Sequence, residues 1–175
     1  SGPRRMTVGA ARDFLLGVRF VDGKGDVVKN GGRVMKNVTG YDLVKLMAGS
    51  FGTLGVLTEV SLKVLPRPET EATLVLNGLS DTEAVQAMAQ AMGSPFEVTG
   101  AAHDPASSKT YLRIEGFEQS VSYRGGRLRD LLAEKAGEAE IEEAEASAET
   151  WRTLRDVTPF AGRKGDVWSL SCKPS

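Results

Sequence analysis

The sequence predicts an α+β protein built from two parts that meet at a pair of closely spaced prolines. Pro66 and Pro68 cannot continue a strand ladder, because proline has no backbone N–H to donate, and the residue pattern changes there. Residues 1–66 combine strand-like runs with glycine turns. Residues 67–175 follow the order strand, helix, strand, strand, helix, strand, which predicts a ferredoxin-like domain with two helices on one face of an antiparallel sheet.

The first part reads as a hairpin, a short helix and a long strand. Residues 16–21 are apolar and predict a strand, and the turn DGKG at 22–25 returns the chain into a partner at 26–29. Residues 42–48 predict one or two helical turns with Asp42 as the N-cap. Residues 53–65 predict the long strand that ends at the prolines.

The second part begins with a strand at 73–76 and a helix at 81–92. Ser80 is the expected N-cap of this helix, and Glu83 lies at the capping-box position. The remaining elements are strands at 96–102 and 110–115, a helix over about 119–135 that Gly125 and Gly126 interrupt, a strand near Ile141, a helix around Trp151, and a last strand over 167–172.

Composition excludes several classes of function. The 175 residues carry 22 Lys and Arg against 23 Asp and Glu, a net charge of -1, so no basic field recruits nucleic acid or an anionic membrane. One cysteine and one histidine cannot form a disulfide or a multi-residue Cys/His metal site. No apolar run is long enough to cross a bilayer. We therefore expect a cytoplasmic protein without a metal, nucleic acid or direct membrane insertion.

Three glycines at every third position, Gly49, Gly52 and Gly55, lead into the long strand. A glycine backbone can lie flat against a ligand because no side chain holds it away, which suits a large, flat, phosphorylated cofactor. The alternative, of equal weight on turn chemistry alone, is a tight connection from helix to strand with no ligand.

The longer pattern is more specific than the glycines. The strings KNVTGYDL at 36–43, GSFGTLGVLTE at 49–59 and LKVLP at 62–66 resemble the second half of the FAD-binding domain of vanillyl-alcohol-oxidase (p-cresol methylhydroxylase, PCMH, type) flavoproteins. SGPRR at 1–5 resembles a segment found within that domain. The resemblance implies that residues 1–66 are the C-terminal part of an FAD-binding domain. Residues 67–175 would be a cap or substrate domain, incomplete at its C-terminus, in a fragment that lacks the first half of the FAD domain.

The resemblance also implies which residues face FAD in the intact protein. It assigns no catalytic residue, and it implies that the fragment alone binds no FAD tightly, because most contacts to the cofactor come from the other half of the domain. Asn37 and Tyr41 would hold the loop in shape. The cofactor-facing residues would be Ser1, Gly2, Gly52, Thr53, Leu54, Gly55, Val56 and Leu57.

In the cap, WRTLR at 151–155 resembles an element of 2-hydroxy-acid dehydrogenases whose arginine, here Arg155, grips the substrate carboxylate. A planar guanidinium suits this role because it donates two parallel hydrogen bonds. The chain departs from the pattern at Trp168, which Ser169 follows in place of a lysine. This departure favours a cap that is catalytically silent.

Within the family, the chain most resembles FAD-binding subunits of bacterial glycolate oxidases. This implies a larger catalytic flavoprotein subunit and an iron-sulfur subunit as partners, with hydride passing from glycolate or a related 2-hydroxy acid to flavin. Such a subunit would be cytoplasmic, or attached to the membrane only through its complex. Two alternatives stay open: an independently catalytic enzyme similar to D-lactate dehydrogenase, and a non-catalytic assembly subunit.

Overall fold

The computed structural model describes residues 4–35, 40–136, 139–170 and 172. The chain divides into two compact units, Ser1–Pro68 and Glu69–Ser175. This division lies two residues after the boundary that the sequence predicts, on the other side of the second proline.

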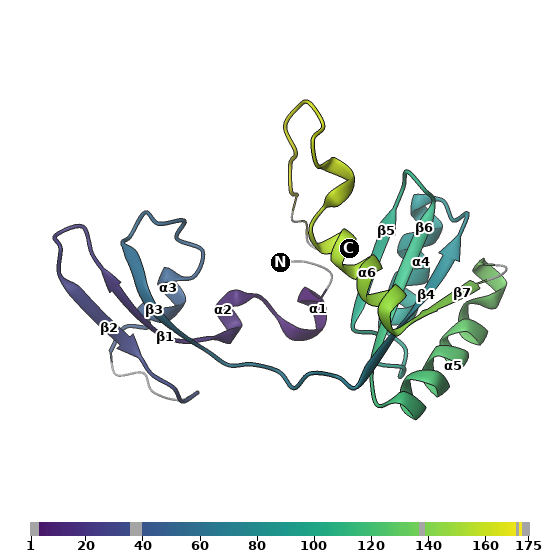
Figure 1. Cartoon of the computed structure of the whole chain (residues 1–175), viewed down its shortest axis with the longest axis horizontal. Coiled ribbons are helices and arrows are strands. Elements are labelled where there is room, and N and C mark those ends of the chain that lie inside the picture. Colours follow the sequence, from purple (N-terminus) through teal and green to yellow (C-terminus); the bar gives the residue numbers. More distant parts are fainter. Residues whose placement is uncertain (1–3, 36–39, 137–138, 171, 173–175) are drawn as a thin grey trace. The chain divides into compact units, whose positions relative to one another are not determined.

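Unit 1 is a three-stranded antiparallel sheet with short helices (Figure 1). The strand order is β2-β1-β3: β1 forms a hairpin with β2 and also pairs in antiparallel fashion with β3, which follows later in the chain. In chain order, the elements are α1 (Arg5–Val8), α2 (Ala11–Phe14), β1 (Leu15–Val21), β2 (Val27–Gly31), α3 (Leu43–Met47) and β3 (Val56–Leu62).

The predicted hairpin and short helix are confirmed, and the local chemistry explains both. The Asp22 carboxylate accepts hydrogen bonds from the backbone N–H groups of Lys24 and Asp26, at 2.8 and 3.0 Å, and this closes the turn between β1 and β2. The Asp42 carboxylate accepts from the N–H of Lys45 at 3.1 Å and caps α3 as expected. Helices α1 and α2 were not predicted.

The hydrophobic core of unit 1 is small and one-sided. Val18 and Phe20 of β1 pack with Val44 and Met47 of α3, and Leu15 completes this core. Side chains alternate between the two faces of a strand, so Val18 and Phe20 lie on the same face of the sheet, the one that α3 covers. β3 is exposed along most of its length, with 69% of Val56 and 47% of Val60 accessible.

Unit 2 has the predicted ferredoxin-like topology. Its four antiparallel strands lie in the order β5-β6-β4-β7, with the first and last strands of the unit adjacent (Figure 1). The elements are β4 (Thr70–Asn77), α4 (Asp81–Met92), β5 (Gly100–Asp104), β6 (Lys109–Gly116), α5 (Glu118–Ala136), β7 (Ala139–Glu143), α6 (Ala144–Arg155) and the 3₁₀ turn η1 (Thr158–Phe160).

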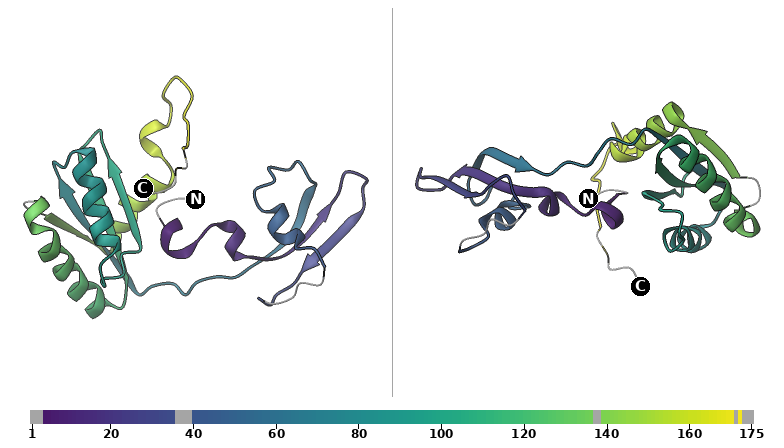
Figure 2. Two further views of the ribbon diagram at one scale, coloured as in Figure 1. Left: turned by 180° about the vertical axis from the view of Figure 1, so that it is seen from behind. Right: turned by 90° about the horizontal axis from the view of Figure 1, so that it is seen from below.

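Helices α4 and α5 lie side by side on one face of this sheet (Figure 2). Leu74, Leu76, Leu112 and Ile114 point from β4 and β6 into the core, against the alanine-rich face of α4. The capping box at Ser80 is confirmed: its N–H donates to the Glu83 carboxylate at 2.9 Å, and the Glu83 N–H returns a bond to its hydroxyl at 3.4 Å.

Two expectations for unit 2 were wrong. The glycine pair does not interrupt α5, because the helix buries Val121, Leu128 and Leu132 in the core, and this outweighs the cost of about 1 kcal/mol for each glycine. The segment 167–170 forms no strand. Its apolar alternation has no partner strand in the described part of the chain, and Trp168 is 81% exposed.

Two strands begin clearly later than predicted. β3 starts at Val56 rather than at residue 53, because a hydrogen bond from the Thr53 N–H to the Ser50 carbonyl closes a turn there. β5 starts at Gly100 rather than at residue 96, because Glu97 has a positive φ of 49° that a strand cannot include. Arg124 holds the preceding turn through the Phe96 carbonyl at 3.2 Å.

Candidate functional site

The glycine loop between α3 and β3 is a compact, hydrogen-bonded turn. The N–H of Ser50 donates to the Met47 carbonyl at 3.2 Å, and the N–H and hydroxyl of Thr53 both donate to the Ser50 carbonyl, at 3.0 and 2.6 Å. Phe51, between these residues, has a φ of 53° and is 98% exposed. The loop therefore has a defined shape and presents its tip to solvent.

The glycines of this loop are required for two different reasons. Gly49 and Gly52 have φ of 87° and 78°, and a Cβ at either position would meet nothing within 4 Å. Gly55 has a φ of 153°, and its Cβ would lie 2.5 Å from the Val21 carbonyl oxygen and 3.0 Å from the Phe20 ring. Gly55 is thus needed for packing on β1, whereas Gly49 and Gly52 leave open space above the backbone.

The other predicted cofactor-facing residues divide by exposure. Leu54, Val56 and Leu57 are 43, 69 and 44% exposed, so these apolar side chains are accessible to a ligand. Thr53 uses its hydroxyl within the loop. Ser1 and Gly2 lie outside the described residues.

Two residues, Asn37 and Tyr41, are predicted to support the loop. Asn37 lies outside the described residues, and the Tyr41 side chain is 88% exposed, so this role stays a prediction. A contact that holds the helix before the loop comes from Asn30 of β2. Its amide donates to the Tyr41 carbonyl at 3.2 Å and accepts from the N–H groups of Leu43 and Val44, at 3.1 and 3.3 Å. It therefore satisfies the start of α3, thirteen residues away in sequence, and no local pattern indicates such a contact.

Lys45 provides a second link that the sequence did not indicate. Its ammonium donates to the carbonyls of Arg12 and Leu15, the latter at 3.1 Å, and so ties α3 to the start of β1. Asn30 and Lys45 together fix the position of α3, and this also fixes the point from which the glycine loop starts.

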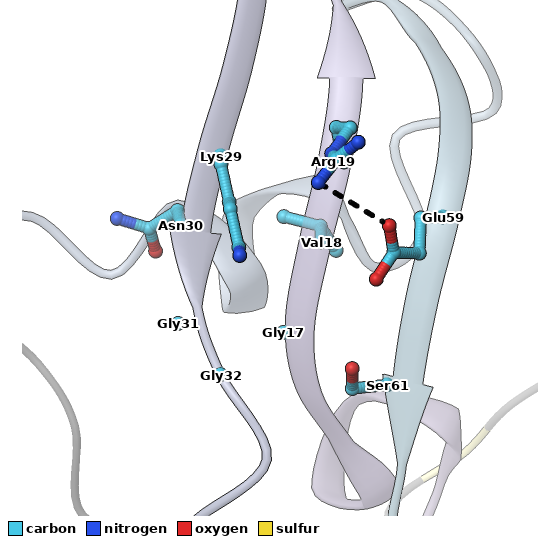
Figure 3. Close-up of a pocket in the computed structure, with 9 residues that line it drawn as sticks. All are labelled: Gly17, Val18, Arg19, Lys29, Asn30, Gly31, Gly32, Glu59 and Ser61. Atoms are coloured by element: carbon cyan, nitrogen blue, oxygen red, sulfur yellow. Dashed lines mark ion pairs between the residues drawn. The ribbon is translucent and has the colours of Figure 1, made fainter.

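A small, shallow hollow, open to solvent, lies on the sheet face that α3 does not cover (Figure 3). Its floor is the backbone of Gly17, Gly31 and Gly32, and Lys29, Arg19 and Glu59 form a row beside it across the three strands. The Arg19 and Glu59 side chains approach to 3.6 Å while about half exposed, so their charges largely offset each other in solvent. The hollow could accept a flat or backbone-like group, but its charges select no ligand class.

In unit 2, Arg155 ends α6 and its side chain is 69% exposed. Its guanidinium donates two hydrogen bonds to the carboxylate of Asp156, at 2.7 and 3.0 Å. These hydrogen bonds hold the pKa of Asp156 below its ordinary value and raise the pKa of Arg155. The fork of Arg155 is thus able to bind a carboxylate, and at present it binds one from its own chain.

Among the described residues, no group of three or more His, Cys, Asp and Glu side chains could hold a metal ion. In the same residues, no helix has the length and apolar character needed to cross a membrane.

No protein-family model matches the chain. The chain is 40% identical to glycolate oxidase subunit GlcE of Escherichia coli over 172 residues, which cover 98% of this chain and 45% of GlcE. It is 45% identical to glycolate oxidase subunit GlcD of Bacillus subtilis over 74 residues, covering 42% of the chain and 16% of GlcD. It is 42% identical over 86 residues to an uncharacterized FAD-linked oxidoreductase of Mycobacterium tuberculosis, covering 49% of the chain and 18% of that protein.

Among solved structures, alkyldihydroxyacetonephosphate synthase is similar with a TM-score of 0.64 and 19% identity, covering 91% of this chain and 35% of that one. This similarity confirms the predicted fold class. The matches to GlcE, GlcD and an FAD-linked oxidoreductase confirm the resemblance that the sequence indicated. The chain spans less than half the length of these relatives.

Proposed function

From the similarity to GlcE along nearly the whole chain, we propose that this protein is an FAD-binding subunit of a 2-hydroxy-acid oxidase or dehydrogenase complex, with glycolate as the substrate. In this proposal, unit 1 is the second half of a PCMH-type FAD-binding domain and unit 2 is the cap. The partners are a larger flavoprotein subunit and an iron-sulfur subunit, and the complex lies in the cytoplasm.

In the structure, the open glycine loop supports this proposal. Gly52 has a positive φ and free space above its backbone, and the apolar side chains of Leu54, Val56 and Leu57 remain accessible beside it. Backbone N–H groups in such a loop can donate to the polar edge of a flat ring system without adding a charge. The neighbouring apolar side chains can cover its faces and exclude water. The residues present therefore fit a flavin or adenine ring.

FAD bound in the intact protein would supply the hydride acceptor for oxidation of the hydroxyl-bearing carbon. The chain's own contribution is to hold and orient reactants. The loop positions the cofactor, because Asn30 and Lys45 fix the helix before it. Arg155 binds the substrate carboxylate through the same two-pronged contact that it makes to Asp156.

A second candidate function has one specific observation in its favour. Ser169 follows Trp168 at the position where the resemblance leads us to expect a lysine. A cap without that lysine suits a subunit that binds FAD and assembles with its partners but does not itself oxidise substrate.

Two alanine substitutions test the cofactor loop in the intact protein. Gly52→Ala and Gly49→Ala introduce the same methyl group at the same kind of positive φ with no steric neighbour, so their cost in strain is matched. Only Gly52 lies in the predicted cofactor-facing segment. We expect Gly52→Ala to weaken FAD binding about tenfold or more and Gly49→Ala to leave it within about twofold. The flavin-to-protein ratio after gel filtration and FAD titration by fluorescence measure this.

Equal FAD retention by both variants, with the intact protein still folded, would remove Gly52 from the cofactor site. Equal loss in both would assign the effect to the shape of the loop rather than to contact at Gly52.

A further inference from the structure

Helix α6 is fastened to unit 2 by a buried polar contact that the proposed function does not use. It lies over the face of the sheet opposite α4 and α5, because Thr73 faces α6 while its neighbours Ala72 and Leu74 face the core. Trp151 is 5% exposed, and Thr73 and Ser147 are fully buried.

Three polar groups meet at this contact. The indole N–H of Trp151 donates to the Thr73 hydroxyl oxygen at 2.7 Å, and the hydroxyls of Thr73 and Ser147 are also 2.7 Å apart. An indole N–H can only donate, so the buried N–H of Trp151 would lose this hydrogen bond if the Thr73 hydroxyl were removed. Thr73 therefore joins two successive turns of α6 to β4.

The ring of Trp151 is held at two further places. The guanidinium of Arg113 on β6 lies 4.4 Å from its centroid. At Gly100 on β5, an added Cβ would lie 3.2 Å from the indole and 3.1 Å from the Arg113 guanidinium, so glycine leaves the space that both side chains occupy. The indole thus reaches from β4 across β6 to β5, and this fixes both the rotation of α6 and its position along the sheet.

Ser147, Trp151 and Arg155 follow one another at intervals of four residues, so they share one stripe of α6. The first two are buried in the contact, and Arg155 is the next residue of the stripe, one turn further along. Both residues lie in one continuous helix, so a change in the rotation of α6 at Trp151 would also displace Arg155.

We infer that Thr73 is a positioning residue for Arg155, acting through the Thr73–Ser147–Trp151 hydrogen bonds that set how α6 lies on the sheet. This inference rests on the proposed function, in which Arg155 binds the carboxylate of a 2-hydroxy acid. It assigns to a buried threonine of β4 a role in substrate affinity, although its side chain contacts no substrate.

Thr73→Val in the intact complex tests the inference, because valine keeps the shape of the side chain and removes the hydroxyl. Thr110→Val is the matched control. Thr110 is equally buried and hydrogen-bonds the imidazole of His103 at 2.9 Å, but it lies on β6 and faces the opposite side of the sheet from Trp151. Thr73→Ser, which keeps the hydroxyl, is the rescue variant, and Arg155→Lys reports on the carboxylate site itself.

We expect Thr73→Val to raise KM for glycolate about fivefold or more with kcat within about twofold, since the interaction lost is uniform binding of the carboxylate. Thr110→Val is expected to lower thermal stability to a similar extent and to leave KM within about twofold. Thr73→Ser should restore KM to within about twofold of the parent value.

The outcomes separate the inference from the proposed function. If Arg155→Lys raises KM while Thr73→Val does not, or if Thr110→Val raises KM as much as Thr73→Val, the positioning role of Thr73 is wrong and the carboxylate site stands. If Arg155→Lys leaves KM and kcat unchanged in an assembled, flavin-loaded complex, the carboxylate site is wrong and the inference falls with it.

Discussion

Gly55→Ala is the sharpest test of how unit 1 is built, because the reason for glycine here is packing rather than open space. The added methyl would lie 2.5 Å from the Val21 carbonyl oxygen and 3.0 Å from the Phe20 ring. The first contact is with the backbone of β1, which is paired on both sides and cannot move alone. The φ of 153° is a further strain for any residue with a Cβ.

The magnitude follows from these contacts. Forcing one methyl into a packed site costs about 1–3 kcal/mol, and an unfavourable positive φ adds about 1–2 kcal/mol. The lower conformational entropy of alanine in the unfolded chain returns about 0.4–1 kcal/mol. The net destabilisation of unit 1 is therefore about 2–4 kcal/mol. Gly52→Ala meets no neighbour, so only the strain and entropy contributions remain, and they sum to about 1 kcal/mol.

Two measurements, hydrogen exchange and fluorescence, separate the stability of unit 1 from that of unit 2. The amides of β1 and β3 report on unit 1, whereas the fluorescence of Trp151 reports on unit 2. A loss of about 2–4 kcal/mol corresponds to exchange about 30-fold to 1,000-fold faster for the most protected amides of β1 in Gly55→Ala, against about tenfold or less in Gly52→Ala. The unfolding midpoint of unit 2, followed by Trp151 fluorescence, should not change in either variant. Equal acceleration in the two variants would refute the argument from packing.

Two further predictions concern the stability of unit 2. Arg124 of α5 is buried and donates to three backbone carbonyls, at 2.7, 3.2 and 3.3 Å, so Arg124→Met should lower the free energy of unfolding by about 2–4 kcal/mol in urea titrations followed by Trp151 fluorescence. The same change at Arg127, which is 56% exposed on the same helix, should cost less than about 0.5 kcal/mol, and equal costs would contradict the assignment. The second prediction concerns the loss of stability at low pH. Hydrogen bonds from the Ser80 side chain and backbone hold the pKa of Glu83 below its ordinary value of 4.5, so its contribution to stability is present above that value and is lost as pH falls through the lowered pKa. Glu83→Gln can still cap α4 but should show a smaller loss of stability between about pH 5 and about pH 3, and an unchanged pH dependence would show that Glu83 does not contribute.

The features that the sequence predicted well are local or periodic. The Ser80–Glu83 capping box lies within four residues, and the helix that follows it begins and ends where its pattern predicts, at Asp81 and Met92. The order of elements in unit 2 was enough to predict its topology, because few arrangements of that order bury all the apolar faces.

The features that the sequence did not predict depend on contacts between distant residues. Asn30 caps α3 across a gap of thirteen residues, and Thr73 meets Trp151 across seventy-eight. The segment 167–170 alternates like a strand, but alternation alone cannot provide a partner. All the site assignments came from resemblance and stay predictions: Ser1, Gly2, Gly52, Thr53, Leu54, Gly55, Val56 and Leu57 at the cofactor, Asn37 and Tyr41 beside its loop, and Arg155 at the substrate.

The difference between the two cores connects the fold of unit 1 to its proposed function. Among the described residues, the core of unit 2 contains thirteen buried residues, whereas that of unit 1 contains five, all on the α3 side of its sheet. The apolar side chains of Val56, Val60 and Leu62 on β3 are 47–69% exposed, and a fully buried side chain of this kind contributes about 1.5–3 kcal/mol. Covering the exposed half of these three side chains would therefore stabilise unit 1 by about 2–4 kcal/mol, which is comparable to the whole effect of Gly55→Ala. Val60 and Leu62 pair with the core residues Val18 and Leu15, so a protein surface that covers them would extend the core of unit 1. Val56 is the one of the three that lies in the predicted cofactor-facing segment, and if FAD covers it in the intact protein, FAD binding would also stabilise β3.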